Sequence, residues 1–139
     1  MPLLDRLIAL VDRLSPPPLV SAHCDLPCGI YDPAQARIEA ESVKACQDKY
    51  QASDDEVFRE RAILIKDDRA ELVKHHLWVL WTDYFKPEHL EKYPELHQLF
   101  WDATKAAGKA RQSVDPTTGQ QLLDLIGQID KIFWETKKG

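Results

Sequence analysis

The chain has 139 residues, of which 44% are hydrophobic and 29% charged, and this composition is typical of one folded domain with one core. No stretch approaches the roughly 18 uncharged apolar residues that a membrane-spanning helix needs. Eighteen lysines and arginines against 23 acidic residues give a net charge of −5, which argues against nucleic acid as a partner, and three cysteines are too few for a disulfide scaffold.

Residues 1–14 have the pattern of a short amphipathic helix, with apolar residues at helical spacing and charged residues between them. Three prolines at 16–18 end this helix, and the small residues at 20–22 resemble the end of a cleavable leader. A secretory signal fits poorly, because the longest uncharged apolar run, residues 7–11, is shorter than the about 7–15 residues of such a signal. We therefore expect residues 1–22 to be a processed cytoplasmic leader or an ordinary N-terminal helix.

Two long helices are predicted in the first half of the remaining chain. Asp32 followed by Pro33 predicts a helix start, with Gln35 completing a capping box, and this helix runs to about residue 50. Ser53 with Glu56 three residues later predicts the start of a second helix. No glycine or proline interrupts it before about residue 84.

Two further helices are predicted after a loop at residues 85–93. Pro94 begins a third helix with Leu96, Leu99, Phe100, Ala103, Ala106 and Ala110 on one face. Asp115 and Pro116 precede a fourth helix with Leu122, Leu125, Ile126, Ile129, Ile132 and Phe133. No segment alternates with the period of a strand. Four helices with short connections predict an all-α, antiparallel up-and-down four-helix bundle over residues 23–139.

Two charged residues interrupt apolar stripes on the first two helices. The stripes consist of Ala36, Glu39, Val43, Cys46 and Tyr50, and of Phe58, Ala62, Ile65, Arg69, Leu72, His76 and Val79. A lone buried charge is costly, so one interpretation pairs Glu39 with Arg69, and the other places both at a solvated rim. Cys46 is interpreted as a small core residue. His75, His76, His89 and His97 lack the i, i+4 partner of a helical zinc site, so we interpret them as structural or surface residues.

The chemistry of the chain concentrates in residues 23–28, which we call the hook. His23 precedes Cys24, and Cys28 follows four residues later, so two thiolates can reach one centre. A local disulfide is one alternative, and a zinc site is another, although zinc prefers four side-chain ligands and only three are local. Two thiolates and two backbone nitrogens suit nickel or copper(II). An amine nitrogen exists only at a chain terminus, so such a site requires removal of residues 1–22.

Residues 23–33 closely resemble the nickel hook of the nickel-containing superoxide dismutase family. Similar runs continue through the chain at residues 83–87, 91–99 and 128–136, and residues 23–139 have the extent of a mature member. The resemblance implies that nickel binds the amine, the backbone nitrogen of Cys24 and the thiolates of Cys24 and Cys28. The imidazole of His23 is implied as an axial ligand.

The same resemblance implies roles for residues around the metal. Glu39 matches a carboxylate that orients the imidazole, and Arg69 an arginine that contacts this carboxylate, as is usual for groups behind metal ligands. Tyr31 matches a tyrosine that guards substrate access. Asp25, Tyr84 and Lys86 lie near it in the family: Asp25 in the hook, Tyr84 at the end of the second predicted helix and Lys86 in the predicted loop that follows.

The implied activity is disproportionation of superoxide to oxygen and hydrogen peroxide, with nickel alternating between +2 and +3. Because superoxide is an anion and the chain is net negative, Lys86 and Arg69 have to attract it locally. The family forms a homohexamer, and Trp78, Trp81 and Trp101 suit either its interfaces or a monomer core. We expect a cytoplasmic enzyme with a leader-processing protease as partner, and no nickel at the hook while residues 1–22 are attached. A helical metal-storage or thiol-regulated protein and an interaction module that uses residues 1–14 are the alternatives from other classes.

Overall fold

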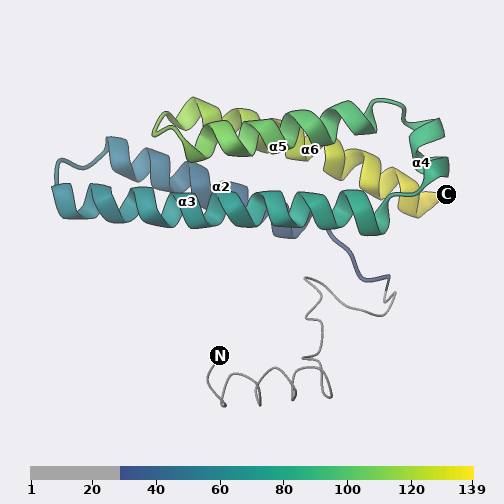
Figure 1. Ribbon diagram of the computed structural model, residues 1–139, viewed down its shortest axis with the longest axis horizontal. Helices are drawn as coiled ribbons and strands as arrows, with labels where there is room; N and C mark the ends of the chain where they lie inside the picture. Colours follow the sequence, from purple (N-terminus) through teal and green to yellow (C-terminus); the bar gives the residue numbers. More distant parts are fainter. Residues whose placement is uncertain (1–28) are drawn as a thin grey trace, which may run out of the picture.

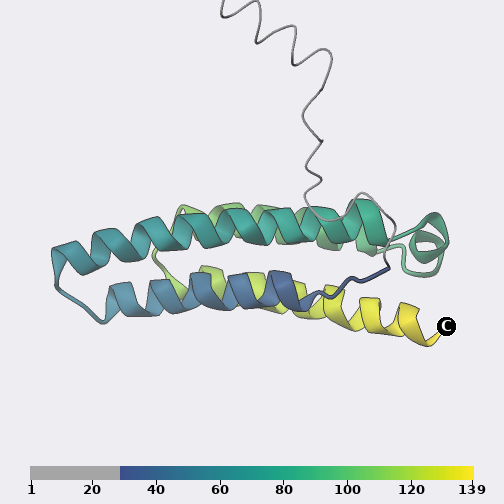
Figure 2. The ribbon, with the colours of Figure 1, turned by 90° about the horizontal axis from the view of Figure 1, so that it is seen from below.

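The computed structural model describes residues 29–139, and the expected leader and the hook lie outside them. The described residues form α2 (Ala34–Gln51), α3 (Glu56–Val79), the π-helical turn η1 (Leu80–Tyr84), α4 (Pro87–Lys92), α5 (Leu96–Arg111) and α6 (Pro116–Lys138), without a strand. Successive long helices run antiparallel (Figures 1 and 2). The helix α2 contacts α3 and α6, and α5 contacts the same two helices. This arrangement confirms the predicted bundle.

Three predicted helix starts differ from the structure. The N-cap of the second helix is not Ser53 but Asp55, whose carboxylate accepts a hydrogen bond of 3.1 Å from the backbone N–H of Phe58. In front of α2, Pro33 occupies the N-cap position and Asp32 instead binds the N–H of Ala34 at 2.8 Å. The helix α5 begins two residues after Pro94.

The predicted loop at residues 85–93 is wrong, because residues 87–92 form α4. Pro87 takes the first helical position, where its missing N–H costs nothing. The backbone N–H of Lys86 donates to Nδ1 of His89 at 3.1 Å, which caps this short helix. With η1 before it, α4 turns the chain from α3 back toward α5 at one end of the bundle (Figure 1).

The apolar stripes predicted for α2 and α3 are rotated relative to the faces that the structure buries. The buried residues are Ala36, Ala40, Val43 and Gln47 on α2, and Ala62, Lys66, Ala70, Val73 and Leu77 on α3. Phe58 and Ile65, placed inside by the prediction, are exposed. Cys46 is half-buried rather than part of the core.

Two buried polar side chains explain why the buried faces of α2 and α3 differ from the predicted stripes, because both side chains bind the end of α5. Lys66 is only 3% exposed and donates to the carbonyl oxygens of Ala110 and Arg111. Gln47 is fully buried and donates to the carbonyl of Ala110 at 3.2 Å and to the hydroxyl of Thr118 at 2.8 Å. The last carbonyls of a helix lack partners within it, so both side chains stabilise the α5–α6 end of the bundle.

The core runs along the bundle axis and continues under the α3–α4 turn. Leu77, Leu96, Leu122, Ile126 and Phe133 are its large, almost fully buried members. The fourth predicted stripe is confirmed at Leu122, Ile126, Ile129, Ile132 and Phe133, and Leu125 lies at its edge. On α5 the prediction missed the buried Ala107 and included Leu99 and Ala106, which are only partly buried. Among residues 29–139, no helix is long and apolar enough to span a bilayer.

Candidate functional site

A cavity of about 420 Å³ lies at the end of the bundle where the chain leaves the hook. Its lining comes from three places: the segment before α2, the α3–α4 turn and the last turn of α6. The lining residues are Gly29, Tyr31, Asp83, Tyr84, Lys86, His89 and Lys137. The structure thus brings together Tyr31, Tyr84 and Lys86, three of the residues that the sequence analysis selected. Figure 2 shows the segment before α2 approaching α2 from the end at which α6 finishes.

Local structure around the cavity explains how these side chains are placed. Gly29, two residues before Tyr31, has a φ of +70°, a left-handed conformation that residues with a side chain rarely adopt. Tyr84 closes the π-helical turn η1, a helix type that often occurs at functional sites. The next residue, Phe85, is buried in the core and anchors the turn, so Lys86 follows on the surface.

The ring of Tyr84 is held on several sides. Its centroid lies 5.6 Å from the ring of Tyr31 and 4.4 Å from that of Phe133. The ring of His89 stacks on it at 5.7 Å, and the ammonium of Lys137 lies 4.9 Å from the centroid. Its hydroxyl lies 2.6 Å from Oγ1 of Thr136. Tyr84 is therefore a fixed wall of the cavity.

The cavity collects more positive than negative charge, although the whole chain is net negative. Lys86 and Lys137 line it together with a single carboxylate, Asp83. The ammonium of Lys137 lies over the faces of Tyr84 and Phe133, at 4.9 and 5.4 Å from the centroids. Such a cation–π arrangement holds the charge at the cavity wall. A small anion therefore meets a favourable local potential here.

Glu39 and Arg69 form an ion pair between α2 and α3, with 3.2 Å between Nη1 of Arg69 and Oε2 of Glu39. The Glu39 side chain is 17% exposed and the Arg69 side chain 40% exposed. Both interpretations of these residues are therefore confirmed in part, because the two charges pair and also lie toward solvent. Neither residue lines the cavity with Tyr31 and Tyr84.

The predicted metal ligands His23, Cys24 and Cys28, and the nearby Asp25, lie outside the described residues. Within residues 29–139, no three His, Cys, Asp or Glu side chains cluster in a way that suits a metal ion. The described part of the chain therefore offers no competing metal site. The donor set of the hook, two thiols and a histidine, fits a nickel ion by its chemistry.

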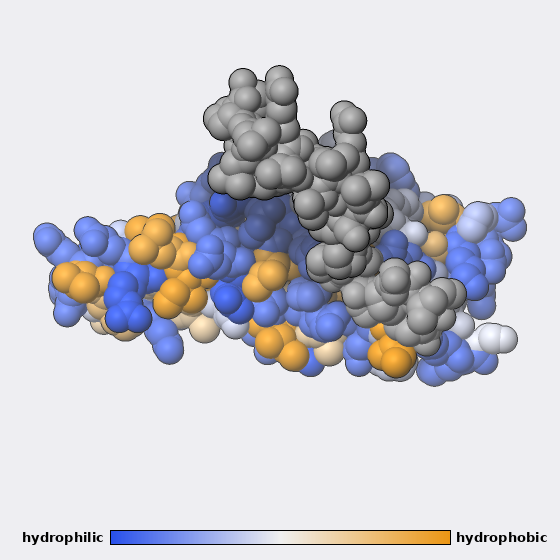
Figure 3. Space-filling model, turned by 60° about the horizontal axis from the view of Figure 1, so that its bottom comes forward, coloured by the Kyte–Doolittle hydropathy of each residue, from blue (hydrophilic) through white to orange (hydrophobic). Residues whose placement is uncertain are grey.

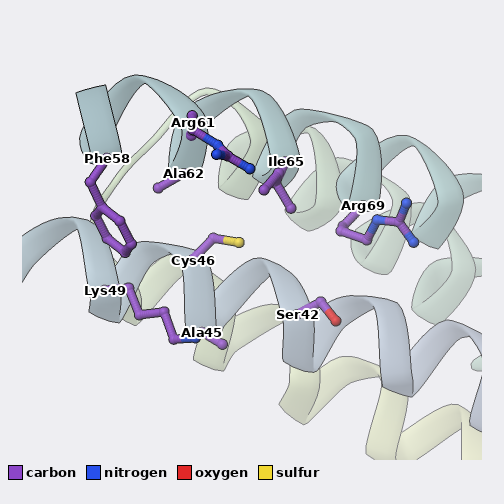
Figure 4. Close-up of a pocket in the computed structure, with 9 residues that line it drawn as sticks. All are labelled: Ser42, Ala45, Cys46, Lys49, Phe58, Arg61, Ala62, Ile65 and Arg69. Atoms are coloured by element: carbon purple, nitrogen blue, oxygen red, sulfur yellow. The ribbon is translucent and has the colours of Figure 1, made fainter. Parts of the chain in front are cut away.

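A second, larger groove of about 530 Å³ lies between α2 and α3 (Figure 4). Phe58, Ala62 and Ile65 line it from α3, and Cys46 from α2 points its sulfur into it, with Arg69 at one end. Burial raises the pKa of the Cys46 thiol, against the opposite effect of Lys49, Lys66 and Arg69. The thiol is therefore protonated at neutral pH, which agrees with an unreactive role.

The sequence patterns do not indicate Lys137, His89 and Thr136 as neighbours of Tyr84. His89 was interpreted as a structural or surface histidine because it lacks a helical partner, but its ring stacks on Tyr84. Thr136 belongs to the family-like run at residues 128–136, and nothing in its spacing indicates the contact with Tyr84. The Thr136 contact depends on how the end of α6 packs against the α3–α4 turn, and the His89 contact depends on how η1 and α4 fold that turn. Helix periodicity encodes neither.

Comparisons with known proteins agree on one family. The family model described as nickel-containing superoxide dismutase matches residues 18–137. Two curated relatives, named as nickel superoxide dismutases, come from Streptomyces coelicolor and Streptomyces seoulensis. Each is 66% identical to this chain over 130 residues, which cover 93% of this chain and 99% of the relative.

Solved structures extend the similarity to three dimensions. A native nickel superoxide dismutase structure and one with nickel ligation corresponding to the oxidised state each share 68% sequence identity with this chain. Each superposes with a TM-score of 0.82, covering 84% of this chain and 100% of the solved chain. The helical bundle is therefore the fold of those enzymes.

Proposed function

Since this chain belongs to the nickel-containing superoxide dismutase family, we propose that the hook and the cavity beside it form one active site. The chain is an oxidoreductase that converts two superoxide radicals and two protons into oxygen and hydrogen peroxide, with nickel as cofactor. Bound nickel supplies one-electron chemistry by alternating between the +2 and +3 states. The observation that carries the proposal is the cavity that gathers Tyr31, Tyr84 and Lys86 where the chain leaves the hook.

In this proposal the hook supplies every nickel ligand. The amine and imidazole of His23, the backbone nitrogen and thiolate of Cys24, and the thiolate of Cys28 hold the ion. The family resemblance supports this set. The hook is joined directly to Gly29, which lines the cavity.

The amine of His23 exists only after the peptide bond to Ala22 is cut, so residues 1–22 act as a leader that a protease removes. The coverage of the solved relatives supports this division. Those chains are matched over their whole length and correspond to 84% of this chain, which is also the share of residues 23–139. The uncut chain is therefore a precursor without nickel at the hook.

Glu39 orients the imidazole of His23, and Arg69 holds Glu39 in place. The ion pair of 3.2 Å supports this role, because a carboxylate fixed by an arginine keeps a defined direction. Glu39 lies five residues into α2, roughly 7.5 Å along the axis from its first residue, on the helix that directly follows the hook and Tyr31.

Tyr31 and Tyr84 limit access to the metal and Lys86 attracts the anion, and the family resemblance assigns Asp25 of the hook to the same site. The contact of 5.6 Å between the two rings supports a shared wall. Fixed aromatic walls keep larger molecules out while admitting a diatomic anion. The two protons of the reaction reach the cavity from solvent, since its lining residues belong to the surface end of the bundle.

We further propose a homohexamer in the cytoplasm that uses neither nucleic acid nor a membrane as partner. Exposed large apolar residues support assembly, among them Phe58, Leu64, Trp78, Trp101 and Trp134. Figure 3 shows hydrophobic residues spread over one face of the molecule, several of them toward one end. Trp81, in contrast, packs on Phe100 at 5.0 Å and serves the monomer.

Metal content and dismutation, measured on the full-length chain and on a chain that starts at His23, test the function. Both preparations receive nickel under the same conditions. We expect about one nickel per chain and rapid dismutation only in the trimmed form. Equal nickel uptake without activity in either form would favour a storage protein, and activity in the uncut chain would contradict the role of the amine.

A further inference from the structure

The hydroxyl of Tyr84 is held by two successive hydrogen bonds that end on the backbone of α6. Its oxygen lies 2.6 Å from Oγ1 of Thr136, and this Oγ1 donates to the carbonyl oxygen of Phe133 at 2.6 Å. A carbonyl oxygen only accepts hydrogen bonds, so the single proton of the Thr136 hydroxyl is committed to Phe133. Thr136 must therefore accept the proton of Tyr84, and the phenol proton points toward α6.

The rest of the Tyr84 side chain has little freedom to undo this arrangement. Phe133 contacts the ring at 4.4 Å, His89 stacks on it, and Lys137 covers it from α6. With the ring fixed, the phenol proton can change direction only by rotation about the bond between Cζ and Oη. The bond to Thr136 fixes that rotation, so the phenol oxygen offers a lone pair rather than a proton to the cavity.

We propose that Thr136 is a positioning residue that makes the oxygen of Tyr84 a hydrogen-bond acceptor toward the cavity. The inference rests on the proposed function, in which superoxide enters this cavity and hydrogen peroxide leaves it. Superoxide accepts hydrogen bonds, whereas hydrogen peroxide and water also donate them. An acceptor oxygen therefore binds water and the protonated product in preference to the anion, and attraction of the anion is left to Lys86 and Lys137.

Substitution of Thr136 by valine tests the orientation. Valine keeps the shape of threonine but cannot accept the phenol proton, so Tyr84 becomes free to donate it to an anion in the cavity. Azide, a small monovalent anion, serves as the probe on the full-length chain without nickel, and NMR of the His89 ring reports its binding. A hydrogen bond to a charged group tightens binding roughly tenfold, so we expect azide to bind about tenfold more tightly to Thr136→Val. Thr136→Ser should bind azide like the unmodified chain.

A Tyr84→Phe background isolates the effect, because the phenol proton is then absent. There, Thr136→Val should leave azide binding unchanged. Equal affinity of Thr136→Val and the unmodified chain, or tighter binding that persists with Tyr84→Phe, would overturn the inference. Circular dichroism checks folding, and Thr136→Ala replaces the valine variant if that variant does not fold.

Dismutation by the nickel-loaded chain that starts at His23 separates this inference from the proposed function. If the unmodified trimmed chain has no activity, the proposed function fails, while the azide titration without nickel still decides the orientation of Tyr84. If that chain is active and the azide affinities do not differ, the positioning role of Thr136 fails and the function stands.

Discussion

Glu39 and Arg69 show what a sequence pattern can establish about single residues. Both interrupt apolar stripes, and the family resemblance gives both a place behind the metal. The structure confirms the pairing that the cost of a buried charge predicts. The pattern does not predict how far each side chain is exposed, because the stripes on α2 and α3 are rotated relative to the buried faces.

Replacing Glu39 by glutamine should reduce dismutation far more than stability. The amide keeps the shape of the carboxylate but loses the charge that, in the proposed function, orients the His23 imidazole, and groups of this kind typically affect metal affinity or activity by about 10–100-fold. The partly exposed ion pair itself contributes about 1 kcal/mol or less to stability. Nickel content, dismutation rate and thermal unfolding of the trimmed chain measure the two effects.

Glu71→Gln provides the matched control, because Glu71 forms another interhelical ion pair, with Arg111 at 2.7 Å. It joins α3 to α5 and lines none of the cavities described above. We expect a similarly small change in stability and no change in dismutation. Equal activity of the Glu39 and Glu71 variants would remove Glu39 from the site.

At the scale of helices, periodicity and capping signals predict the order of the long elements and their approximate ends. These signals fail where contacts with distant segments determine which face of a helix is buried. Gln47 and Lys66 are polar, so the pattern places them on the solvated faces, but each binds carbonyl oxygens at the end of α5. These partners lie far along the chain, and burial of the two side chains rotates both apolar faces. The short helix α4 was missed because Pro87 was interpreted as a loop signal rather than a helix start.

The cap of α6 should make stability depend on pH. The backbone N–H of Thr117 lowers the pKa of the Asp115 carboxyl below its ordinary value of 3.8. Because the folded-state pKa is the lower one, the stabilisation is complete above the ordinary pKa and is lost as pH falls through the folded-state pKa. Asp115→Ala should therefore lower the melting temperature at pH 7, and the difference should disappear in strong acid.

Asp115→Asn is the control for charge, since an asparagine side chain still caps a helix without titrating. Its melting temperature at pH 7 should stay close to that of the unmodified chain. Thermal unfolding followed by circular dichroism between pH 7 and pH 2 measures all three proteins. A constant difference between Asp115→Ala and the unmodified chain over this range would contradict the linkage.

Two glycines of α6 should respond to alanine with opposite signs. A Cβ on Gly119 would lie 2.5 Å from Oε1 of Gln47 and 3.0 Å from Cα of Lys44, whereas a Cβ on Gly127 meets nothing within 4 Å. Gly119→Ala should destabilise the bundle by about 1–3 kcal/mol, since α2 has to move. Gly127→Ala should stabilise it by up to about 1 kcal/mol, because alanine favours a helix. Urea unfolding measures both, and equal signs would contradict the close approach of α2 and α6 at Gly119.

The whole molecule is a bundle whose candidate site lies at one end, and only part of this was predictable. Helix number and connection lengths predict the bundle. The family resemblance indicates Tyr31, Tyr84 and Lys86, and the structure places them in one cavity. Thr136 and Lys137 escaped prediction because their contact with Tyr84 arises only when the last turn of α6 packs against the α3–α4 turn.

Charge over the whole molecule and charge at the cavity act on superoxide in opposite directions. The net charge of −5 repels the anion, while Lys86 and Lys137 attract it at the cavity. If local attraction decides, added salt screens the lysines and lowers the kcat/KM of dismutation in the trimmed, nickel-loaded chain. The double variant Lys86→Met/Lys137→Met should have a kcat/KM lower by about tenfold at low salt, within the range of electrostatic steering.

In the same double variant, salt screens the repulsion that remains between the negative chain and superoxide. The kcat/KM should therefore rise with ionic strength, so the slope of kcat/KM against ionic strength should change sign. Lys105→Met removes one positive charge from α5, where Lys105 lies over Trp101 at 4.8 Å and lines a different cavity. That control should keep the downward slope, because its charge lies away from the entrance. Pulse radiolysis at several salt concentrations measures the rates. An unchanged slope in the double variant would show that the two lysines do not guide the substrate and that the attraction arises elsewhere at the site.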